Sequence, residues 1–224
     1  EDGFIKLAQK KIFYDLIILS VGSRSNLYTK IEEGRSIEKN YEEIAITSTI
    51  KHNTRIENVS QFFLKEGPLA ILPFKKKEFS IVWSVSNKFF GINKKNIKKI
   101  LSEKLNFLLN TNSIKYIENV QSYPINLNLK TKYFKKNVLI LGDGLHAVHP
   151  MAGQGFNLVL RDIKKLKELM SKTLKLGLLI KDSFLLKDFY NERKPENNLF
   201  GFGINLINIF FKDNKYFSSL KKGM

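Results

Sequence analysis

The sequence has 224 residues, a formal net charge of +17 and no cysteine. This length allows one large domain or two small ones with a sizeable apolar core. The absence of cysteine excludes disulfides, thiolate metal sites and cysteine nucleophiles. No apolar run approaches the roughly 20 residues that a transmembrane helix needs, and no signal-peptide pattern is visible.

The positive charge would suit nucleic acid, an anionic membrane or a phosphorylated ligand. Only five of the basic residues are Arg, and the lysines are spread along the chain, with Lys75–Lys77 the densest run. Proteins that recognise nucleic-acid sequence tend to use Arg at base edges and to interleave aromatic residues. Lys, Asn and Ile are abundant throughout, so a compositional bias is the simpler explanation. We therefore expect no nucleic-acid partner.

The first segments indicate part of an α/β domain. Glu1–Gly3 predicts a hairpin turn, and the apolar run Tyr14–Ser20 predicts a buried parallel strand. The strand leads into a turn at Val21–Ser25, in which Ser25 is a candidate N-cap. The polar stretch Ile31–Asn40 predicts a loop or a short helix.

Three strands are then predicted in succession, at Tyr41–His52, Leu69–Leu72 and Phe79–Ser86. Short turns between them indicate a mostly antiparallel sheet, which is a module distinct from the flanking α/β parts. One face of the last strand carries a stripe of large apolar residues, namely Phe79, Ile81, Trp83 and Val85. We expect this stripe in the core, and contact with a ligand is the alternative.

The chain then returns to the α/β part. Asn93–Leu109 predicts an amphipathic helix, and Ile114–Tyr123 predicts a strand that ends at Pro124. Asn126–Lys136 leads back toward a further strand. The sheet module is therefore expected as an insertion between two pieces of one α/β domain.

The richest stretch begins at Val138–Leu141, a short apolar run typical of a strand that is buried on both faces. It ends at Gly142-Asp143, so a carboxylate follows the carboxyl end of the strand, where ligands lie in open α/β sheets. A loop with Gly and Pro follows, and then a helix that is expected to begin near Gly153–Gly155. Such a helix start offers unpaired N–H groups and a positive dipole end.

Six apolar residues recur at helical spacing after this start and are expected to bury one face of the helix: Phe156, Val159, Leu160, Ile163, Leu166 and Met170. Together with Asp143, the helix start would suit a ligand that has both hydroxyl groups and an electron-rich head. The alternative is an ordinary βα connection whose Asp only caps the helix.

The run G-D-G-L-H-A-V-H-P-M-A-G-Q-G-F-N-L, Gly142–Leu158, resembles the second flavin motif of the FAD-dependent aromatic hydroxylases, which are para-hydroxybenzoate-hydroxylase-like enzymes. The resemblance is greatest to their ubiquinone-biosynthesis branch. The turn at Val21–Ser25 resembles the family's DG motif, from which Val21 and Tyr28 depart. Y-N-E-R-K-P-E-N at Tyr190–Asn197 resembles a C-terminal segment of the family.

The resemblance implies an FAD site and no catalytic side chain. Asp143 would hold the ribityl hydroxyls, the Pro150–Gly155 loop would pass the flavin ring, and His146 would fix the loop. The implied cofactor-binding residues are Gly22, Ser25, Gly142, Asp143, Pro150, Ala152, Gly153, Gln154, Gly155 and Asn157.

A metal site is the alternative for part of this stretch, because Asp143, His146 and His149 fall at steps of three. Gly144 and Pro150 disfavour a regular helix there, so we expect no metal.

The implied fold class is α/β, or α+β overall, with an incomplete FAD-binding Rossmann-like domain, an inserted antiparallel substrate domain and C-terminal helices. The FAD-binding parts would be residues 1–34 and 126–178, the substrate domain 35–125 and the helical segment 179–224. The family's first motif, G-x-G-x-x-G, does not occur in this sequence. We therefore expect an N-terminally incomplete chain that alone binds FAD weakly or not at all.

As a function, the resemblance implies a monooxygenase that uses NAD(P)H and O2 to hydroxylate a polyprenylated phenol in ubiquinone biosynthesis. It also implies other proteins of that pathway as partners and a cytoplasmic location, peripheral at the inner membrane. Leu199–Phe211 would be a membrane-surface segment or a helix that closes the core, and we favour the core because the run contains two Gly and two Asn. The alternative function is a non-catalytic remnant or partner subunit with a lipid- or protein-binding role, which the missing motif and Val21 favour.

Overall fold

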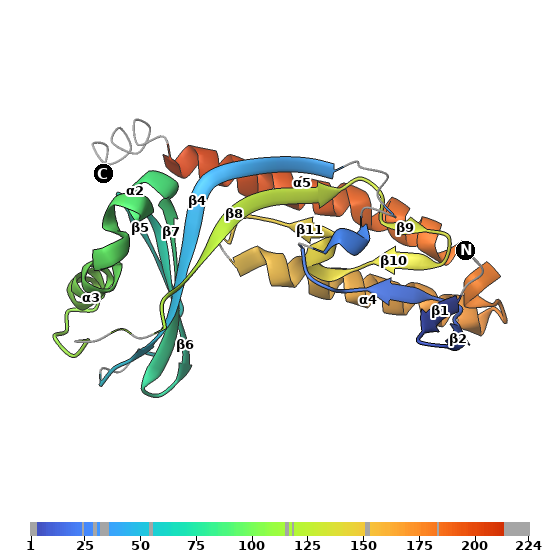
Figure 1. Cartoon of the computed structure of the whole chain (residues 1–224), viewed down its shortest axis with the longest axis horizontal. Coiled ribbons are helices and arrows are strands. Elements are labelled where there is room, and N and C mark those ends of the chain that lie inside the picture. The colour runs from blue at the N-terminus through green and yellow to red at the C-terminus, as the bar shows by residue number, and fades with distance from the viewer. Residues whose placement is uncertain are drawn as a thin grey trace. The chain divides into compact units, whose positions relative to one another are not determined.

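The computed structural model describes residues 4–23, 25–28, 31, 36–53, 56–114, 117, 119–150, 153–182 and 184–212. Helices and strands combine in a mixed α/β fold, which confirms the expected class (Figure 1). The chain forms two compact units. The first joins Glu1–Lys39, Leu127–His149 and Gly153–Ile207, and the second is built mainly on Asn40–Asn126. The four-part domain division stays a prediction.

The first unit contains a small sheet of three strands in the order β3-β10-β9. Strand β3 (Ile17–Leu19) runs parallel to β10 (Val138–Ile140), which pairs antiparallel with β9 (Phe134–Lys135). Leu139 and Ile140 are fully buried. The two apolar runs that predicted parallel strands are therefore neighbours in one sheet. The prediction of burial is wrong for β3, which is shorter than Tyr14–Ser20 and leaves Ile18 43% exposed at the edge of the sheet.

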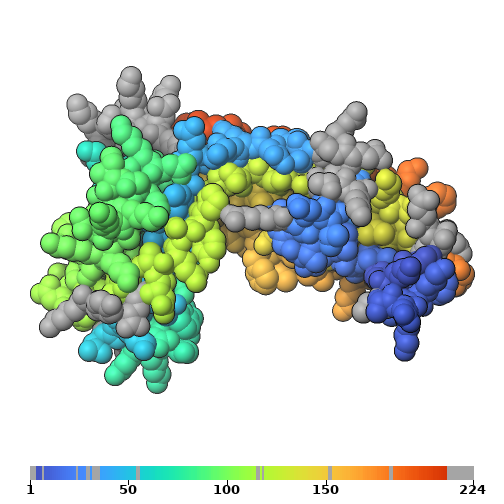
Figure 2. Space-filling view, viewed as in Figure 1, coloured from blue at the N-terminus to red at the C-terminus, as the bar shows by residue number. Residues whose placement is uncertain are grey.

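A separate hairpin precedes this sheet. Strand β1 (Phe4–Leu7) pairs with β2 (Lys10–Phe13), whose side chains are exposed, and the pair lies on the surface (Figure 2). Its turn lies at Ala8, which has a φ of 54°. The turn expected at Glu1–Gly3 lies outside the described residues.

Two long helices complete the first unit: α4 (Gln154–Lys175) and α5 (Leu185–Lys212), with a short 3-10 turn η5 (Ile180–Asp182) between them. They pack on the strands through one cluster of buried side chains, to which Leu166 and Phe189 belong. No helix among the described residues combines the length and the apolar character needed to span a bilayer.

The start of α4 lies where the sequence predicts it, but the predicted buried face is largely wrong. Phe156 is 70% exposed, while Leu160 and Ile163 are nearly half exposed. Leu166 is buried as predicted, and the other buried residues are Leu158, Asp162, Leu169 and Thr173. Apolar periodicity misses this face because a carboxylate, Asp162, lies in its centre.

Helix α5 is one continuous helix that includes Pro195 and contains both Tyr190–Asn197 and the run Leu199–Phe211. Burial along the run Leu199–Phe211 is mixed. Gly201 and Ile204 are buried, whereas Leu206 and Phe210 are more than 60% exposed. This pattern places only one side of the run in the core.

A third sheet has six strands in the order β11-β8-β4-β7-β6-β5. Its neighbouring strands from β4 through β7 to β6 and β5 are antiparallel, which confirms the mostly antiparallel sheet. The strands are β4 (Ser36–Lys51), β5 (Ser60–Leu64), β6 (Gly67–Lys75), β7 (Glu78–Ser86), β8 (Gln121–Lys130) and β11 (His146–Ala147).

Three of the predicted strands have clearly different bounds in the structure. Ser36–Asn40 belongs to β4 and not to a loop, and β6 continues through Pro73, with a register shift before Lys75. Strand β8 begins only at Gln121 and continues through Pro124. A proline is tolerated there because residues 121–124 are exposed, so its missing N–H leaves no buried acceptor unpaired.

The apolar face of β7 forms the core of the second unit. Trp83 lies opposite Ile46 and Phe79 opposite Ile50, and the cluster also includes Leu101 of helix α3 (Ile97–Leu108). Trp83 and Phe79 are fully buried, which confirms that the stripe belongs to the core. The alternative, that the stripe contacts a ligand, is wrong. Helix α3 starts four residues later than predicted, after a helix α2 (Asn87–Asn93) and a 3-10 turn.

Helix α2 begins with a side-chain cap that offers a local test. The Ser86 hydroxyl accepts a hydrogen bond from the Phe89 backbone N–H at 3.1 Å. Ser86→Ala is expected to lower the free energy of unfolding by about 1 kcal/mol, because one N–H of the first turn loses its acceptor. Urea unfolding measures the loss. Ser86→Asp keeps an acceptor and should retain most of the stability; an equal loss in both variants would contradict the capping role.

Candidate functional site

The candidate site begins where the parallel strands β3 and β10 end. Parallel strands have their carboxyl ends at the same edge of a sheet, and here the Leu141 N–H donates to the Leu19 carbonyl at 3.0 Å. The next residue, Gly142, has a φ of +80°, and a Cβ there would lie 3.0 Å from Ser20 Oγ. The structure therefore brings together the ends of two strands that are more than a hundred residues apart in the sequence.

Tyr28 connects the two turns that follow these strands. It ends a short 3-10 helix (Asn26–Tyr28) and is 1% exposed. Its hydroxyl accepts a hydrogen bond from the Val21 N–H at 3.1 Å, and a side chain at Gly144 would overlap the same phenol. The sequence marks Tyr28 only as a departure from a motif, whereas the structure makes it the contact that holds both turns.

The first turn also matches the predicted cap. Ser25 Oγ accepts a hydrogen bond from the Leu27 N–H at 3.3 Å, at the start of the 3-10 helix. Gly22 is exposed and has a φ of +79°, with no other atom within 4 Å of a Cβ built there. This backbone conformation favours glycine and leaves open space above the turn.

The second turn presents a carboxylate. Asp143 lies in a single 3-10 turn between Gly142 and Gly144, which are both buried, while Asp143 itself is exposed. It makes no hydrogen bond or ion pair with any part of the chain that the structure describes. An ionised carboxylate accepts hydrogen bonds only, so this anchored, unpaired group can receive hydroxyl donors from a ligand.

The N-terminus of α4 adds the third component. Its N-cap, Gly153, has a φ of +61°, gives no side-chain cap and has open space around the Cβ position. Gln154 and Gly155 are half-buried, and Asn157 is exposed. A helix of this length whose first N–H groups lack a side-chain cap favours an electron-rich group near its end. Pro150 is half-buried, and Ala152 lies outside the described residues.

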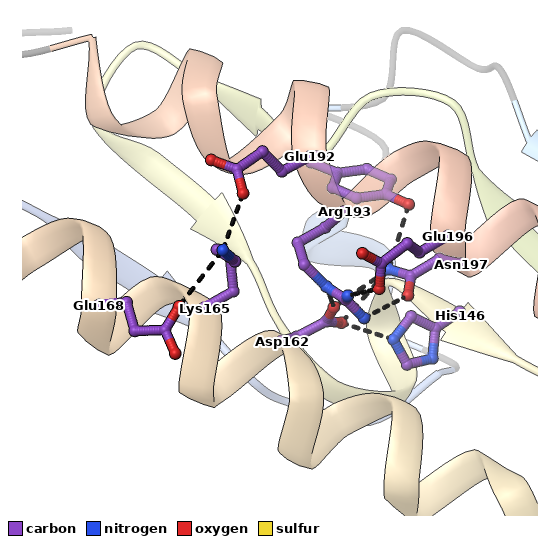
Figure 3. A network of polar contacts seen from close by, with 9 residues as sticks. His146, Asp162, Lys165, Glu168, Glu192, Arg193, Glu196 and Asn197 are labelled. Atoms are coloured by element: carbon purple, nitrogen blue, oxygen red, sulfur yellow. Dashed lines mark hydrogen bonds and ion pairs between the residues drawn. The ribbon is translucent and has the colours of Figure 1, made fainter.

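A buried ionic network connects α4 to the neighbouring elements through Asp162 (Figure 3). Asp162 is fully buried and accepts a hydrogen bond from Arg193 Nε at 2.6 Å. Its other oxygen lies 2.6 Å from His146 Nε2, and Asn197 Nδ2 donates to it as well. Arg193 in turn donates to the Asn197 side-chain oxygen at 2.9 Å and contacts Glu196. The network links β11, α4 and α5.

Tyr133 closes the network on one side. Asn197 Nδ2 donates to its hydroxyl at 3.3 Å, and burial raises the pKa of the phenol because a phenolate there would lose its hydration. Tyr133 therefore remains neutral in the network at physiological pH.

The network holds the fold and does not face the candidate ligand. Asp162, Arg193 and Asn197 are at most 3% exposed, so no ligand reaches them. His146 faces Asp162 and not Asp143, in agreement with a role in fixing the loop. Among the described residues, no group of three or more His, Cys, Asp or Glu could hold a metal ion.

Comparison with known proteins identifies the family. The model of the FAD binding domain family matches residues 22–195. The Dictyostelium discoideum protein named ubiquinone biosynthesis monooxygenase COQ6, mitochondrial, is 25% identical over an alignment of 260 positions. The alignment covers 95% of this chain and 52% of that protein. The Rhodospirillum rubrum protein named ubiquinone hydroxylase UbiL is 28% identical over 164 residues, which cover 71% of this chain and 38% of that protein.

A solved structure shares the fold. The Pseudomonas aeruginosa protein pqsL, described as a probable FAD-dependent monooxygenase, aligns with a TM-score of 0.78 and 17% identity over 98% of this chain and 63% of its own. The chain spans about half the length of the Dictyostelium relative. Because the family model covers most of the sequence, including both turns and the start of α4, the chain belongs to the FAD binding domain family.

Proposed function

We propose that this chain forms the part of a flavin-dependent monooxygenase that holds the ring and ribityl end of FAD. The observation that carries the proposal is the unpaired Asp143 carboxylate, anchored between buried glycines at the carboxyl ends of β3 and β10. Its place at the end of parallel strands is where nucleotide-like ligands bind in such sheets. The family membership supports FAD as that ligand.

The residues present fit this cofactor. Asp143 would accept hydrogen bonds from ribityl hydroxyls, and Gly22 and Ser25 would border the flank of the cofactor. The N-terminus of α4, with Gly153, Gln154 and Gly155, would lie at the ring, where its N–H groups and dipole stabilise negative charge. Gly142, Pro150, Ala152 and Asn157 complete the proposed set. Bound FAD would supply the electron transfer from NAD(P)H to O2 that places one oxygen atom on the substrate.

The substrate that we propose is a polyprenylated phenol of ubiquinone biosynthesis. The names of the Dictyostelium and Rhodospirillum relatives, a ubiquinone biosynthesis monooxygenase and a ubiquinone hydroxylase, support this choice. NAD(P)H as reductant, other proteins of the pathway as partners and a place at the inner membrane belong to the same proposal. The protein's own contribution is to orient the flavin, to tune charge at its ring and to exclude water.

A flavin titration tests the site directly. We expect the purified chain to bind FAD more weakly than micromolar, because G-x-G-x-x-G is absent and the residues named above contact only the ring and ribityl end. FMN, which lacks the adenylate half, should bind about as well as FAD. Flavin fluorescence measures both affinities. FAD binding at micromolar strength or tighter would contradict this expectation, and no FMN binding at millimolar concentration would contradict the site.

The role of Asp143 predicts a specific loss. Asp143→Ala is expected to weaken FMN binding about tenfold or more, because a charge-assisted hydrogen bond to a hydroxyl contributes about 1.5–3 kcal/mol. Asp143→Asn keeps one acceptor oxygen and should lose less. Asp188→Ala removes another exposed aspartate of the same unit and should leave the affinity unchanged. If Asp143→Ala and Asp188→Ala changed the FMN affinity equally, a specific role of Asp143 in binding the flavin would be contradicted.

A non-catalytic binding subunit is the second candidate. Val21, 52% exposed beside Gly22, favours it, since an apolar residue there cannot make polar contacts to a cofactor. On this alternative the chain binds neither FMN nor FAD, whereas the proposed function requires measurable FMN binding.

A further inference from the structure

Strand β5 (Ser60–Leu64) forms one edge of the six-stranded sheet. It pairs with β6 on one side, and among the described residues no strand lies on its other side. An open edge presents backbone N–H and C=O groups that can pair with another strand, and many proteins block this with a lysine, a proline or a bulge. The segment S-Q-F-F-L contains no charge and no proline, and its register with β6 is regular. The strand is therefore built as one that a further strand can join.

The register with β6 shows which backbone groups face outward. Phe63 lies opposite Pro68, which has no N–H, so this pair is not one of the hydrogen-bonded pairs of the ladder. Bonded and non-bonded pairs alternate, so Gln61, opposite Ala70, also belongs to a non-bonded pair. The backbone N–H and C=O of Gln61 therefore point to the open edge, where no hydrogen bond from the described part of the chain meets them.

Apolar side chains are exposed on both sides of Gln61. Val59, which directly precedes the strand, is 70% exposed, and Phe63 is 53% exposed. Gln61 and Phe63 lie on the face opposite to that of Phe62, which packs against the core of the second unit. The protein's own core therefore leaves an apolar residue in water two positions before and two positions after the outward backbone groups.

We propose that β5 pairs antiparallel with β5 of a second copy of this chain, about a two-fold axis at Gln61. In this register the two Gln61 backbones exchange two hydrogen bonds, and Val59 of each copy lies opposite Phe63 of the other. Two positions further out, the exposed Glu57 lies opposite the exposed Lys65, so opposite charges meet at both ends. A two-fold contact needs a self-complementary surface, and the segment around Gln61 is self-complementary in charge and in apolar character.

The neighbouring register fits less well. Centred on Phe63, the pairing would place Lys65 opposite Gln61 and Val59 opposite Gly67, so that neither the exposed valine nor the lysine gains a matching partner. Five residues from each copy form a contact smaller than a standard protein–protein interface, so we expect a dimer that dissociates on dilution.

The proposal goes beyond the flavin site and does not depend on it. Strand β5 belongs to the second unit, whereas Asp143 and the start of α4 belong to the first. The experiments below use the full chain without flavin, so their failure is distinct from a failure of the flavin site.

Disulfide trapping tests the contact, because the chain has no cysteine of its own. Oxidation of Gln61→Cys with diamide should give a disulfide-linked dimer, since bonded cross-strand neighbours have Cα atoms about 5.5 Å apart, within disulfide range. The matched control is Ile92→Cys, at a side chain that is 74% exposed in α2. It should give at least about tenfold less linked dimer, because no pairing brings its two copies within that range. Non-reducing electrophoresis measures the yield.

Two further cysteines test the register. Val59→Cys or Phe63→Cys alone should link poorly, because identical residues four positions out of register lie about 13 Å apart. A mixture of the two variants should link well, since each cysteine then lies opposite the other.

Gln61→Pro tests the backbone pairing without a cross-link. Proline removes only the N–H that points to the open edge, so the hydrogen bonds between β5 and β6 remain. Sedimentation velocity over a concentration series should show a monomer–dimer equilibrium for the unaltered chain and a monomer for the variant. Circular dichroism and the fluorescence of Trp83 verify that the variant is folded.

Four outcomes would overturn the proposal. The first is equal yields of linked dimer from Gln61→Cys and Ile92→Cys. The second is an unaltered chain that stays monomeric throughout the concentration series, as it will if this edge instead takes an extended peptide from a different protein. The third is a dimer that Gln61→Pro leaves intact, which would place the contact on another surface. The fourth is a mixture of Val59→Cys and Phe63→Cys that links no better than either variant alone.

Discussion

Asp162→Ala is expected to lower the free energy of unfolding by about 3–5 kcal/mol, as the removal of one partner from a buried ion pair does. The carboxylate is fully buried and receives Arg193 at 2.6 Å, so its loss leaves a guanidinium that is only 3% exposed without its one fully buried carboxylate partner, with Glu196 and Asn197 as its remaining acceptors. His146 Nε2 and the Asn197 amide lose the same partner. Urea unfolding followed by far-ultraviolet circular dichroism measures the change.

The double variant Asp162→Ala/Arg193→Met separates the lost pair from the unpaired charge. It should recover part of the stability, because no buried guanidinium then remains without its Asp162 partner. Asp188→Ala, at an exposed aspartate, should change stability by less than about 0.5 kcal/mol. If Asp162→Ala is no more destabilising than Asp188→Ala, the network does not hold α4 in place.

Gly67→Ala is expected to destabilise the second unit by about 3 kcal/mol or more. Gly67 begins β6 with a φ of +136°, a conformation that residues with a side chain rarely adopt. An added Cβ would also overlap the Ser84 backbone carbonyl of β7, which is fixed by strand pairing and has no rotamer through which to yield. Trp83, the only tryptophan in the sequence, belongs to the core of this unit, so its fluorescence follows the unfolding.

Gly91→Ala is the matched control. Gly91 lies in α2, has no left-handed φ, and has open space around the Cβ position. The same substitution there should be neutral or stabilise by up to about 1 kcal/mol, because alanine is the better helix former. Similar losses at both glycines would mean that the close approach of Gly67 to β7 is unimportant.

Local patterns in the sequence predicted much of the fold. The alternation in Phe79–Ser86 identified β7 and the face that is buried, since every second side chain of a strand points to the same side. The glycines near residue 153 predicted the start of α4 to within one residue. The same patterns failed at Ile114–Tyr123, where β8 starts later and passes through Pro124 at an exposed end.

Local sequence patterns likewise predicted some parts of the candidate site and missed others. The motif Gly142–Leu158 supplied the glycines, Asp143 and the helix start, all of which lie within seventeen consecutive residues. Tyr28 was missed because its partners, Val21 and Gly144, are defined only when β3 and β10 pair. The signal that was available for Asp162 is its position between Leu158 and Leu166, a charge on an otherwise apolar helical stripe.

By itself, the sequence determined which segments form strands and helices, where the glycine turns occur and which family the motifs resemble, because each depends on residues close together along the chain. Only the tertiary structure decided which face of α4 is buried, what lies opposite Asp162 and which leucines stay in water. Arg193 is 31 residues from Asp162, and that separation closes only when α5 packs on α4. Burial of a charge is favourable only with its partner present, so the buried face follows from the packing and not from the hydrophobic pattern.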